Sequence, residues 1–380
     1  MSKAKIKDKV KLELAILSGG CCERCGVYMY EDFLTKKKVK FAEHAHIIPD
    51  SDDVSAPRSE SYIEDYDRES CENLMPLCSS CHTIIDNAPE EFPRDALLNM
   101  KKMHEDRIKY LVTLSKDKEV NTIIYSSRIK NCEPQFNREL IKETILNDGF
   151  YPKNNGWFDL SCNLAIGDDD ELYYEAQIKS LINNFESNKT KMFERKSILF
   201  ALAPQPVLIR LGMLCNKLFD ISVKQKVRNP EGWSWPPECS DLIFNLDKPN
   251  VINCNNEVCL VFSISDYIDN KRIKDVMGKN VDIWNISIEN PNLNCVLKEK
   301  HIEDFSKMCI QVLNELLSFY GMSKQINIFP AMPNSLAIEF GRCYLPKVHN
   351  GLVLFDQVKN NDVNEFKKAF SFIGGNDVFS

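Results

Sequence analysis

The hydrophobic and polar positions of this chain repeat with two periods, one typical of strands and one of helices. In the second part of the chain, apolar runs of strand length are followed by stretches with apolar residues at helical spacing. Two such units resemble each other: SILFALAP continues into VLIRLGMLCNKL, and INIFPAMP continues into SLAIEFGRCYL. In both, a glycine follows the proline by eight residues. The pattern predicts strand-helix-strand units with parallel strands, in two halves related by a pseudo-dyad.

The first part of the chain has shorter elements separated by polar stretches. The pattern predicts a helix at 7–17, a cysteine-containing turn, a short hairpin, a long polar loop at 51–69 and a closing helix at 94–111. A polar stretch then follows the closing helix. We therefore predict a first domain at 1–115, a linker at 116–131 and a second domain at 132–380.

Composition agrees with two folded domains and excludes several classes of protein. The 380 residues are 43% hydrophobic and 27% charged, which is typical of a globular chain with a sizeable core. No apolar run approaches the roughly 20 residues that cross a bilayer. The N-terminal sequence mixes lysines with acidic residues and has no apolar signal region. We expect a cytoplasmic protein that does not contact a membrane.

Charge and cysteine content direct attention to the first part of the chain. The formal net charge of -7 argues against binding nucleic acid through bulk charge alone. The fifteen cysteines are odd in number, and no export signal accompanies them, so reduced thiols or metal ligands are expected rather than disulfides. Six of these cysteines and four of the six histidines lie before residue 105. A metal ion there would supply local positive charge.

Two CxxC pairs, CERC at 22–25 and CSSC at 78–81, form the first candidate site. Each pair can present two thiolates to one tetrahedral ion, and four soft thiolates suit structural zinc. The predicted zinc ligands are Cys22, Cys25, Cys78 and Cys81, with Cys21 as an alternative to Cys22. Zinc binding would stabilise a segment too small to build a strong core alone.

Further motifs lie between and after these pairs: FAEHAHIIP, ENLMPLC, a histidine directly after the last cysteine, and the helix KKMHEDR. In this order they resemble an HNH endonuclease with a ββα-metal fold and a zinc ribbon, over roughly residues 15–110. The resemblance implies that His46 is the general base and His82 a ligand of the catalytic metal. The resemblance also implies that Asn73 is the central asparagine of the HNH motif, and we therefore predict it both as a catalytic residue and as a ligand of the catalytic metal.

The chemistry of phosphodiester hydrolysis suits these residue types. A neutral imidazole can deprotonate water near pH 7, and Mg²⁺ or another divalent cation can stabilise the charge on phosphate and the leaving alkoxide. Many family members carry a second metal ligand directly before the base, where this chain has Ala45. In this chain, Glu43 or His44 could supply that second metal ligand instead. The strand period places His44 on the face of His46 and Glu43 on the opposite face, which does not choose between them.

The second part of the chain resembles another family. SILFALAPQPVLIRLGMLCNKL, VRNPEGWSWP and INIFPAMPNSLAIEFGRCYLPKVHNGLVLFDQ are similar to a SAVED domain, over roughly residues 140–380. Such domains have two Rossmann-like, CARF-like halves and bind a cyclic nucleotide. They are fused to effectors in cyclic-oligonucleotide-based antiphage signalling systems (CBASS). An N-terminal HNH domain followed by a SAVED domain is one of the effector architectures of these systems.

The ligand of a parallel α/β sheet lies beyond the carboxyl ends of the strands, where helix N-termini offer N–H groups to phosphate. A base can also stack on tryptophan, and Lys or Arg can contact phosphate. The candidate ligand-binding residues are Gln205, Lys224, Arg228, Trp233, Trp235, Asn334, Ser335, Arg342 and Lys347. Three alternatives stay open: Asn334 or Ser335 as a plain helix cap, one tryptophan in the core, and a structural role for GRCYLPK.

We therefore predict an α+β HNH domain with a four-cysteine zinc ribbon, followed by a larger α/β sensor domain. The expected function is a cyclic-nucleotide-activated, metal-dependent endonuclease that degrades double-stranded DNA in antiphage defence. A cyclic di- or trinucleotide would assemble it into a homo-oligomer. One alternative is a restriction-type HNH nuclease whose C-terminal domain recognises DNA. Another is a zinc-ribbon binding module with a degenerate HNH site.

Overall fold

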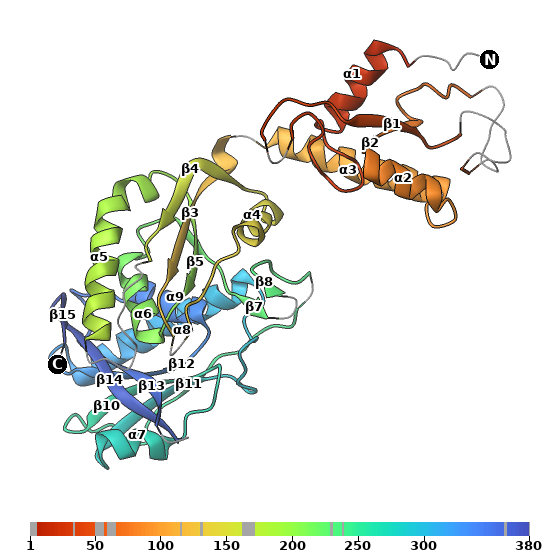
Figure 1. Cartoon of the computed structure of the whole chain (residues 1–380). Helices are drawn as coiled ribbons and strands as arrows, with labels where there is room; N and C mark the ends of the chain where they lie inside the picture. The colour runs from red at the N-terminus through yellow and green to blue at the C-terminus, as the bar shows by residue number, and fades with distance from the viewer. Residues whose placement is uncertain are drawn as a thin grey trace. The chain divides into compact units, whose positions relative to one another are not determined.

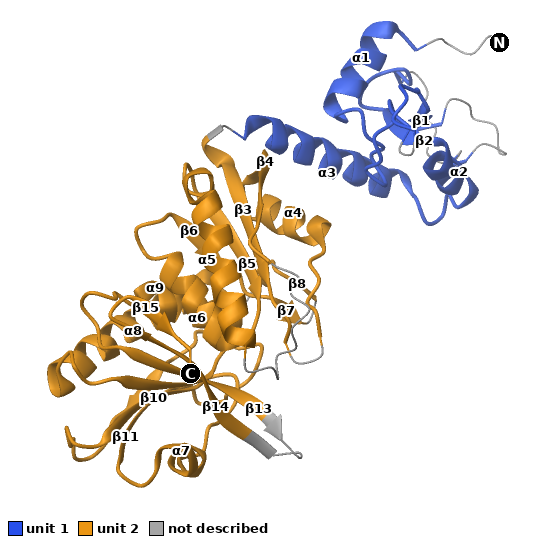
Figure 2. Ribbon diagram, turned by 60° about the vertical axis from the view of Figure 1, so that its left-hand side comes forward, with its two compact units in different colours: residues 1–115 blue, residues 116–380 orange. Residues whose placement is uncertain are grey.

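The chain divides into two compact units, residues 1–115 and residues 116–380 (Figure 1, Figure 2). The computed structural model describes residues 6–32, 35–49, 57–58, 66–114, 116–129, 132–161, 172–228, 231–237, 239–360 and 363–379. Within these ranges, no helix combines the length and the apolar character needed to cross a bilayer.

The first unit is built on two short antiparallel strands followed by a helix. These strands lie on either side of the stretch 51–69, so they are not the short hairpin that was predicted before it. Its elements are α1 (Asp8–Leu17), β1 (Ala42–His46), β2 (Leu74–Cys78), α2 (Ser79–Asn87) and α3 (Arg94–Thr113). β1 and β2 pair antiparallel, with Ala42 opposite Cys78 and His46 opposite Leu74. The small core includes Ala45, Leu77 and Ile85, so this strand pair packs on α2 through the residues between its polar positions. The predicted helices at 7–17 and 94–111 are confirmed.

The second unit begins with a parallel sheet of four strands. In the order β4-β3-β5-β6, these are β4 (Tyr151–Asp159), β3 (Glu119–Ser126), β5 (Ser197–Leu202) and β6 (Ile221–Val223). Its helices are α4 (Arg138–Asn147), α5 (Tyr173–Met192) and α6 (Gln205–Leu214). The predicted linker at 116–131 is wrong, because β3 lies inside it as an inner strand with Ile123 and Tyr125 fully buried. Polar residues on both sides of that strand concealed it.

A second sheet of seven strands completes the unit, in the order β15-β14-β13-β12-β10-β11-β9. Four adjacent strands are mutually parallel: β13 (Leu352–Asn360), β12 (Ile326–Ala331), β10 (Glu257–Ser263) and β11 (Val281–Ser287). The antiparallel strands are β9 (Asn245–Asp247), β14 (Val363–Ile373) and β15 (Asn376–Val378). The remaining elements are α7 (Asn270–Met277), α8 (Glu299–Tyr320), α9 (Asn334–Cys343) and the hairpin of β7 (Val227–Arg228) and β8 (Glu231–Gly232).

Helices α6 and α9 lie side by side between the two sheets (Figure 1), and their contact explains the repeated glycine. A Cβ atom added to Gly212 would lie 2.0 Å from the carbonyl oxygen of Ile338. A Cβ atom added to Gly341 would lie 2.0 Å from the carbonyl oxygen of Ile209. Any side chain would therefore push the two backbones apart. The contact is reciprocal, and it places the two strand ends that precede these helices at one edge of the unit.

Candidate functional sites

The four cysteines of the two CxxC pairs come together in the first unit. Their sulfur atoms all lie within 4.8 Å of one another. Cys78 ends β2 and Cys81 lies in the first turn of α2, so the cluster fixes the junction between strand and helix. Burial of its sulfur raises the pKa of Cys25 to about 12, so a cation that binds this cluster would have to displace the thiol proton. The alternative ligand Cys21 lies outside this cluster.

His82 lies in a second polar cluster, directly after the cysteines. Its Nδ1 is 2.6 Å from Oε2 of Glu43, and its Nε2 is 3.2 Å from Oδ2 of Asp86. The hydrogen bond with His82 lowers the pKa of Glu43, which keeps this carboxylate ionised. Of the two alternatives left open by the sequence, the structure thus brings Glu43 to His82. Burial, with Lys40 and Lys11 as further causes, lowers the pKa of His44.

His46 ends β1, and a carboxylate holds its ring. Its Nε2 lies 3.3 Å from Oε1 of Glu69, and both side chains are largely shielded from solvent. The buried guanidinium of Arg58 donates to the carbonyl oxygen of His46 at 3.4 Å and to Oδ1 of Asp86 at 3.1 Å. Arg58 therefore ties the end of β1 to α2, on which His82 and Asp86 lie.

Sequence reasoning missed Arg58, Glu69 and Asp86. Arg58 and Glu69 fall in the stretch that was interpreted as a polar loop, where residue type alone does not reveal a partner. Asp86 carried a usable signal, because it follows His82 by four residues and such pairs share one face of a helix.

Asn73 directly precedes β2, and its side-chain amide is bonded to backbone groups. Its side chain is buried, and its Oδ1 accepts a hydrogen bond from the backbone N–H of Ile48 at 2.7 Å. Its Nδ2 donates to the carbonyl oxygens of Ile48 at 3.0 Å and Arg68 at 3.1 Å. The amide is fully used in holding the backbone on either side of the site. We therefore replace the predicted role of Asn73 as a metal ligand by a positioning role.

The second unit contains a cavity of about 730 Å³ at the carboxyl ends of its parallel strands. Residues that follow strands of both sheets line it, as expected for the binding crevice of an open α/β sheet. Among the predicted ligand-binding residues, Gln205, Arg228 and Asn334 line this cavity. Gln225 and Lys226 line it as well and were not predicted. We call it the strand-end cavity.

Four of the remaining candidates have structural roles and do not line this cavity. Ser335 is buried and donates its hydroxyl to Oε1 of Gln225 at 2.8 Å. Lys224 is buried in an ion pair with Asp148 at 2.5 Å, and its ammonium lies 5.0 Å from the ring centroid of Trp235. Trp233 is buried and Trp235 packs against the core. Three of these side chains are buried, whereas Trp235 is partly buried and its Nε1 has no hydrogen-bond partner among the described residues. Because none of the four lines the strand-end cavity, we do not retain them as proposed ligand contacts.

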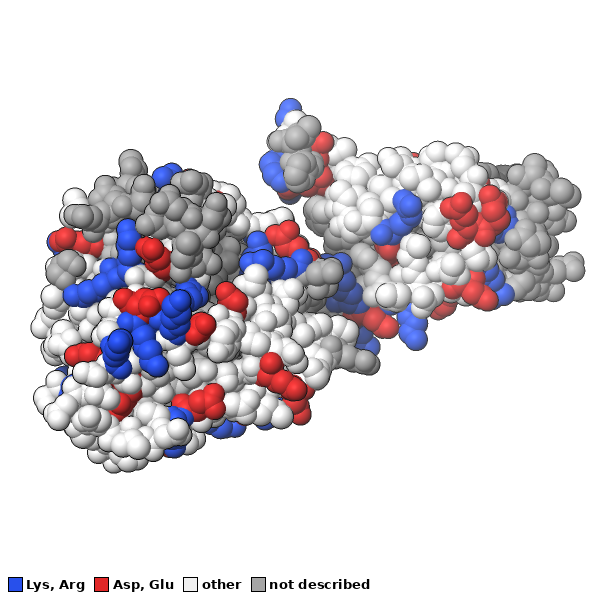
Figure 3. Space-filling view, turned by 90° about the horizontal axis from the view of Figure 1, so that it is seen from below, with Lys and Arg blue, Asp and Glu red and all other residues white. Residues whose placement is uncertain are grey.

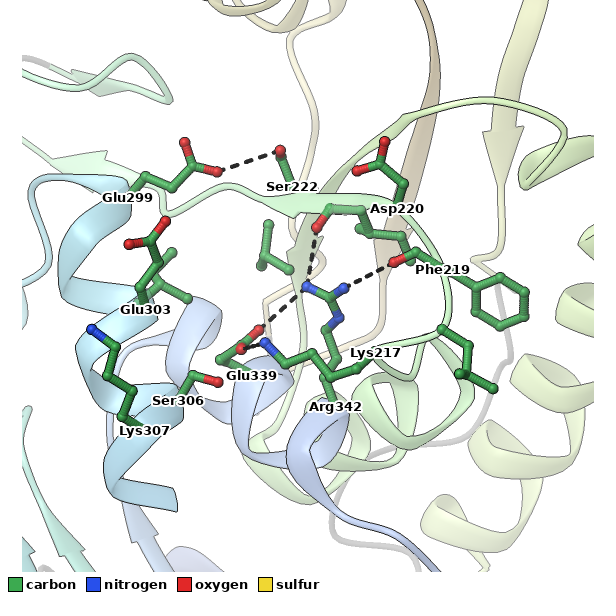
Figure 4. A pocket seen from close by; sticks show the side chains of 14 residues that line it. Lys217, Phe219, Asp220, Ser222, Glu299, Glu303, Ser306, Lys307, Glu339 and Arg342 are labelled. Carbon is green, nitrogen blue, oxygen red and sulfur yellow. Dashed lines mark hydrogen bonds and ion pairs between the residues drawn. The ribbon is translucent and has the colours of Figure 1, made fainter. Parts of the chain in front are cut away.

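Arg342 is also structural. Its buried guanidinium donates to the carbonyl oxygens of Cys215, Phe219 and Ile221, at 2.9, 3.2 and 3.0 Å respectively. It borders a separate cavity of about 660 Å³ beside β6 and α8 (Figure 4). Four carboxylates and three cations line that cavity, and two of the cations, Lys217 and Arg342, are already paired with Glu339. Lys347, the last candidate, is exposed and does not line the strand-end cavity.

Comparison with known families matches two models to this chain. The model described as "HNH endonuclease" matches residues 22–88. The model described as "SMODS-associated and fused to various effectors sensor domain", SAVED, matches residues 177–372, which is more than half of the chain. No curated protein matches the chain.

Several solved structures are similar to the chain at low sequence identity. The Cap4 SAVED/CARF-domain containing receptor of Acinetobacter baumannii is 11% identical, covers 77% of this chain and 61% of its own, and has a TM-score of 0.43. The same receptor with the cyclic trinucleotide 2'3'3'-cAAA is 10% identical, covers 76% of this chain and 62% of its own, and has a TM-score of 0.45. The Cap4 SAVED/CARF-domain containing receptor of Moraxella osloensis is 12% identical, covers 76% of this chain and 59% of its own, and has a TM-score of 0.37. The chain thus spans about three fifths of the length of these receptors.

Proposed function

This chain belongs to the SAVED family and carries an HNH endonuclease domain ahead of its sensor domain, and we therefore propose that it is a DNA endonuclease. A cyclic nucleotide that binds the sensor domain would switch on this activity. The observation that carries the proposal is the presence in one chain of two sites. One is a histidine–carboxylate site next to a cluster of four cysteines, and the other is a strand-end cavity in an α/β unit. Antiphage defence is the biological setting that this combination supports.

In the nuclease unit, His46 is proposed as the general base. A carboxylate beside Nε2 accepts a hydrogen bond from the N–H of that nitrogen, so Glu69 would leave Nδ1 unprotonated as the basic atom that takes a proton from the attacking water. Asn73 and Arg58 would hold the backbone around His46 in place. These contacts give the base a fixed orientation, which proton transfer in a phosphodiester hydrolase requires.

We propose that His82 and one neighbouring carboxylate would hold the catalytic metal. Glu43 lies at Nδ1 of His82 and Asp86 at Nε2, so one of them would share a divalent cation with the ring and the other would orient the ring through its second nitrogen. Such a cation supplies charge stabilisation to the phosphate and the leaving alkoxide. We propose structural zinc for the four cysteines. Since Cys81 directly precedes His82, the zinc would also fix the start of the helix that carries that histidine.

In the sensor unit, we propose that the strand-end cavity binds a cyclic di- or trinucleotide. The N-termini of α6 and α9, at Gln205 and Asn334, meet at this cavity. Pro206 has no N–H and that of Ser335 donates to Oε1 of Gln225 at 3.0 Å, so we propose the N–H groups of Gln205 and Asn334 for phosphate. Arg228 adds a positive charge at the edge of the cavity. Ligand binding would stabilise a homo-oligomer in which nuclease domains act on double-stranded DNA, because an ungated nuclease would attack the DNA of its own cell.

The restriction-type alternative is less well supported. Its C-terminal domain would need a surface of Lys and Arg that follows the DNA backbone. On the face shown in Figure 3, Lys and Arg side chains are interspersed with Asp and Glu. This pattern does not favour a DNA-reading surface on that face, whereas the strand-end cavity gives the second unit a small-molecule site.

The substitution Asn334→Glu tests the sensor site. A glutamate in the first turn of α9 is compatible with the helix, but it places a negative charge where phosphate is proposed to lie. We expect at least about tenfold weaker binding of the cyclic nucleotide, measured by calorimetry with a panel of cyclic di- and trinucleotides. Lys347→Glu is the matched control, because it makes a larger charge change outside the cavity and should leave the affinity unchanged. Equal affinity of Asn334→Glu and the wild type would contradict the assignment.

A further inference from the structure

A smaller cavity of about 220 Å³ adjoins the strand-end cavity. It lies at the ends of β3 and β4 and is lined by Ser126, Asp159 and, from α5, Gln177. The segment 133–135 lines both cavities and so forms a wall that they share. A ligand that fills the larger cavity therefore lies next to this segment. We call the smaller one the amide cavity.

Gln177 is the unusual residue of the amide cavity. Its side chain is only 2% exposed, and its Oε1 has no hydrogen-bond partner among the described residues. A buried amide oxygen without a partner is destabilising, and such atoms are rare in folded proteins unless water or a ligand pairs with them. Gln177 lines the cavity, so a bound molecule would contact its side chain, and a small rotation of the amide would bring the oxygen to that molecule.

The other lining groups are also polar. Ser126 and Ser161 are joined by their hydroxyls at 3.2 Å, and Asp159 accepts from the backbone N–H of Ser161 at 2.9 Å. Two guanidinium groups, of Arg128 and Arg138, and the ring of Phe136 complete the lining. A molecule in this cavity would therefore meet an aromatic ring together with several hydrogen-bond donors and acceptors.

We propose that the amide cavity binds one nucleobase of the cyclic nucleotide whose ring and phosphates occupy the strand-end cavity. A glutamine side chain offers a donor and an acceptor side by side, which is the pattern that the edge of a base presents. A volume of about 220 Å³ suits a base rather than a whole nucleotide. This inference rests on the proposed function, and it adds that the ligand is held asymmetrically, with one base inserted behind the wall at 133–135.

The substitution Gln177→Met tests the inference. It keeps the length of the side chain and removes the amide, so binding should weaken at least about tenfold. The melting temperature of the free protein should stay the same or rise, because an unpartnered buried amide is lost. Thr122→Val is the matched control. Thr122 is fully buried in β3, its hydroxyl also has no partner among the described residues, and it lines neither cavity. Its replacement should not change the affinity.

The measurement is calorimetric titration of the full chain with cyclic di- and trinucleotides of adenosine and guanosine. Gln177→Asn, which withdraws the amide by one methylene, replaces the methionine variant if that variant melts early. Weaker binding by a Gln177 variant, with Thr122→Val unchanged, supports the base site. Wild-type affinity in the Gln177 variants overturns the base site and leaves the proposed function standing. If the wild type itself binds none of the probes, the proposed sensor function fails first.

Discussion

The variant His46→Ala is expected to lose DNA cleavage while it still folds and binds the cyclic nucleotide. The loss should be about 10²- to 10⁴-fold, because general-base catalysis contributes rate factors of that order. The His46 side chain is 23% exposed and bonds to Glu69 rather than filling the core, so the fold should tolerate its removal. Plasmid cleavage in Mg²⁺ with the activating nucleotide measures the first effect, and calorimetry measures the second.

The control for this variant is His44→Ala, two residues earlier on the same strand. The structure pairs Glu43, not His44, with His82, so His44→Ala should keep most of its cleavage activity. Retained cleavage in His46→Ala would refute the assignment of the base. Loss of cleavage in both variants would instead indicate that the strand, rather than one imidazole, is required.

Removal of zinc is expected to unfold the first unit and leave the second unit folded. The first unit has a small core, and structural zinc contributes roughly 10–16 kcal/mol of apparent binding free energy in small zinc-binding peptides. The second unit has its own large core and contains no part of the cysteine cluster. Cys81→Ser should therefore lose bound zinc and cleavage, but keep nucleotide binding.

Zinc content, limited proteolysis of each unit and calorimetry together check this expectation. Cys71→Ser is the matched control, because Cys71 lies in the same unit but outside the cluster. It should behave as the wild type. A Cys81→Ser variant that lacks zinc and still resists proteolysis over residues 1–115 would contradict the proposed structural role of zinc.

The sequence predicted those parts of the molecule that are recognisable from the spacing of a few residue types. The CxxC pairs lead directly to the cysteine cluster, because two residues between thiols is the spacing that one ion requires. The equal distances from proline to glycine predicted the strand-to-helix steps from β5 to α6 and from β12 to α9, although the two sheets differ in strand number and direction. The reason for the glycines, a backbone contact between α6 and α9, needed the structure.

Predictions that depended on a partner elsewhere in the chain were less successful. Lys224 and Arg342 look like phosphate contacts in the sequence. In the structure, Lys224 forms an ion pair with Asp148, and Arg342 donates hydrogen bonds to three backbone carbonyl oxygens. Glu69 looked like loop sequence and instead faces His46. Residue type shows what a side chain can do, whereas its partners are fixed by the fold.

Cleavage of a plasmid in Mg²⁺, with and without a panel of cyclic di- and trinucleotides, tests the central claim most directly. The account predicts that the wild-type chain leaves the DNA intact until one compound is added, and that this compound then switches on degradation. Equal cleavage in the absence of every compound would contradict it. The second unit would then not act as a sensor, and the restriction-type alternative would take its place.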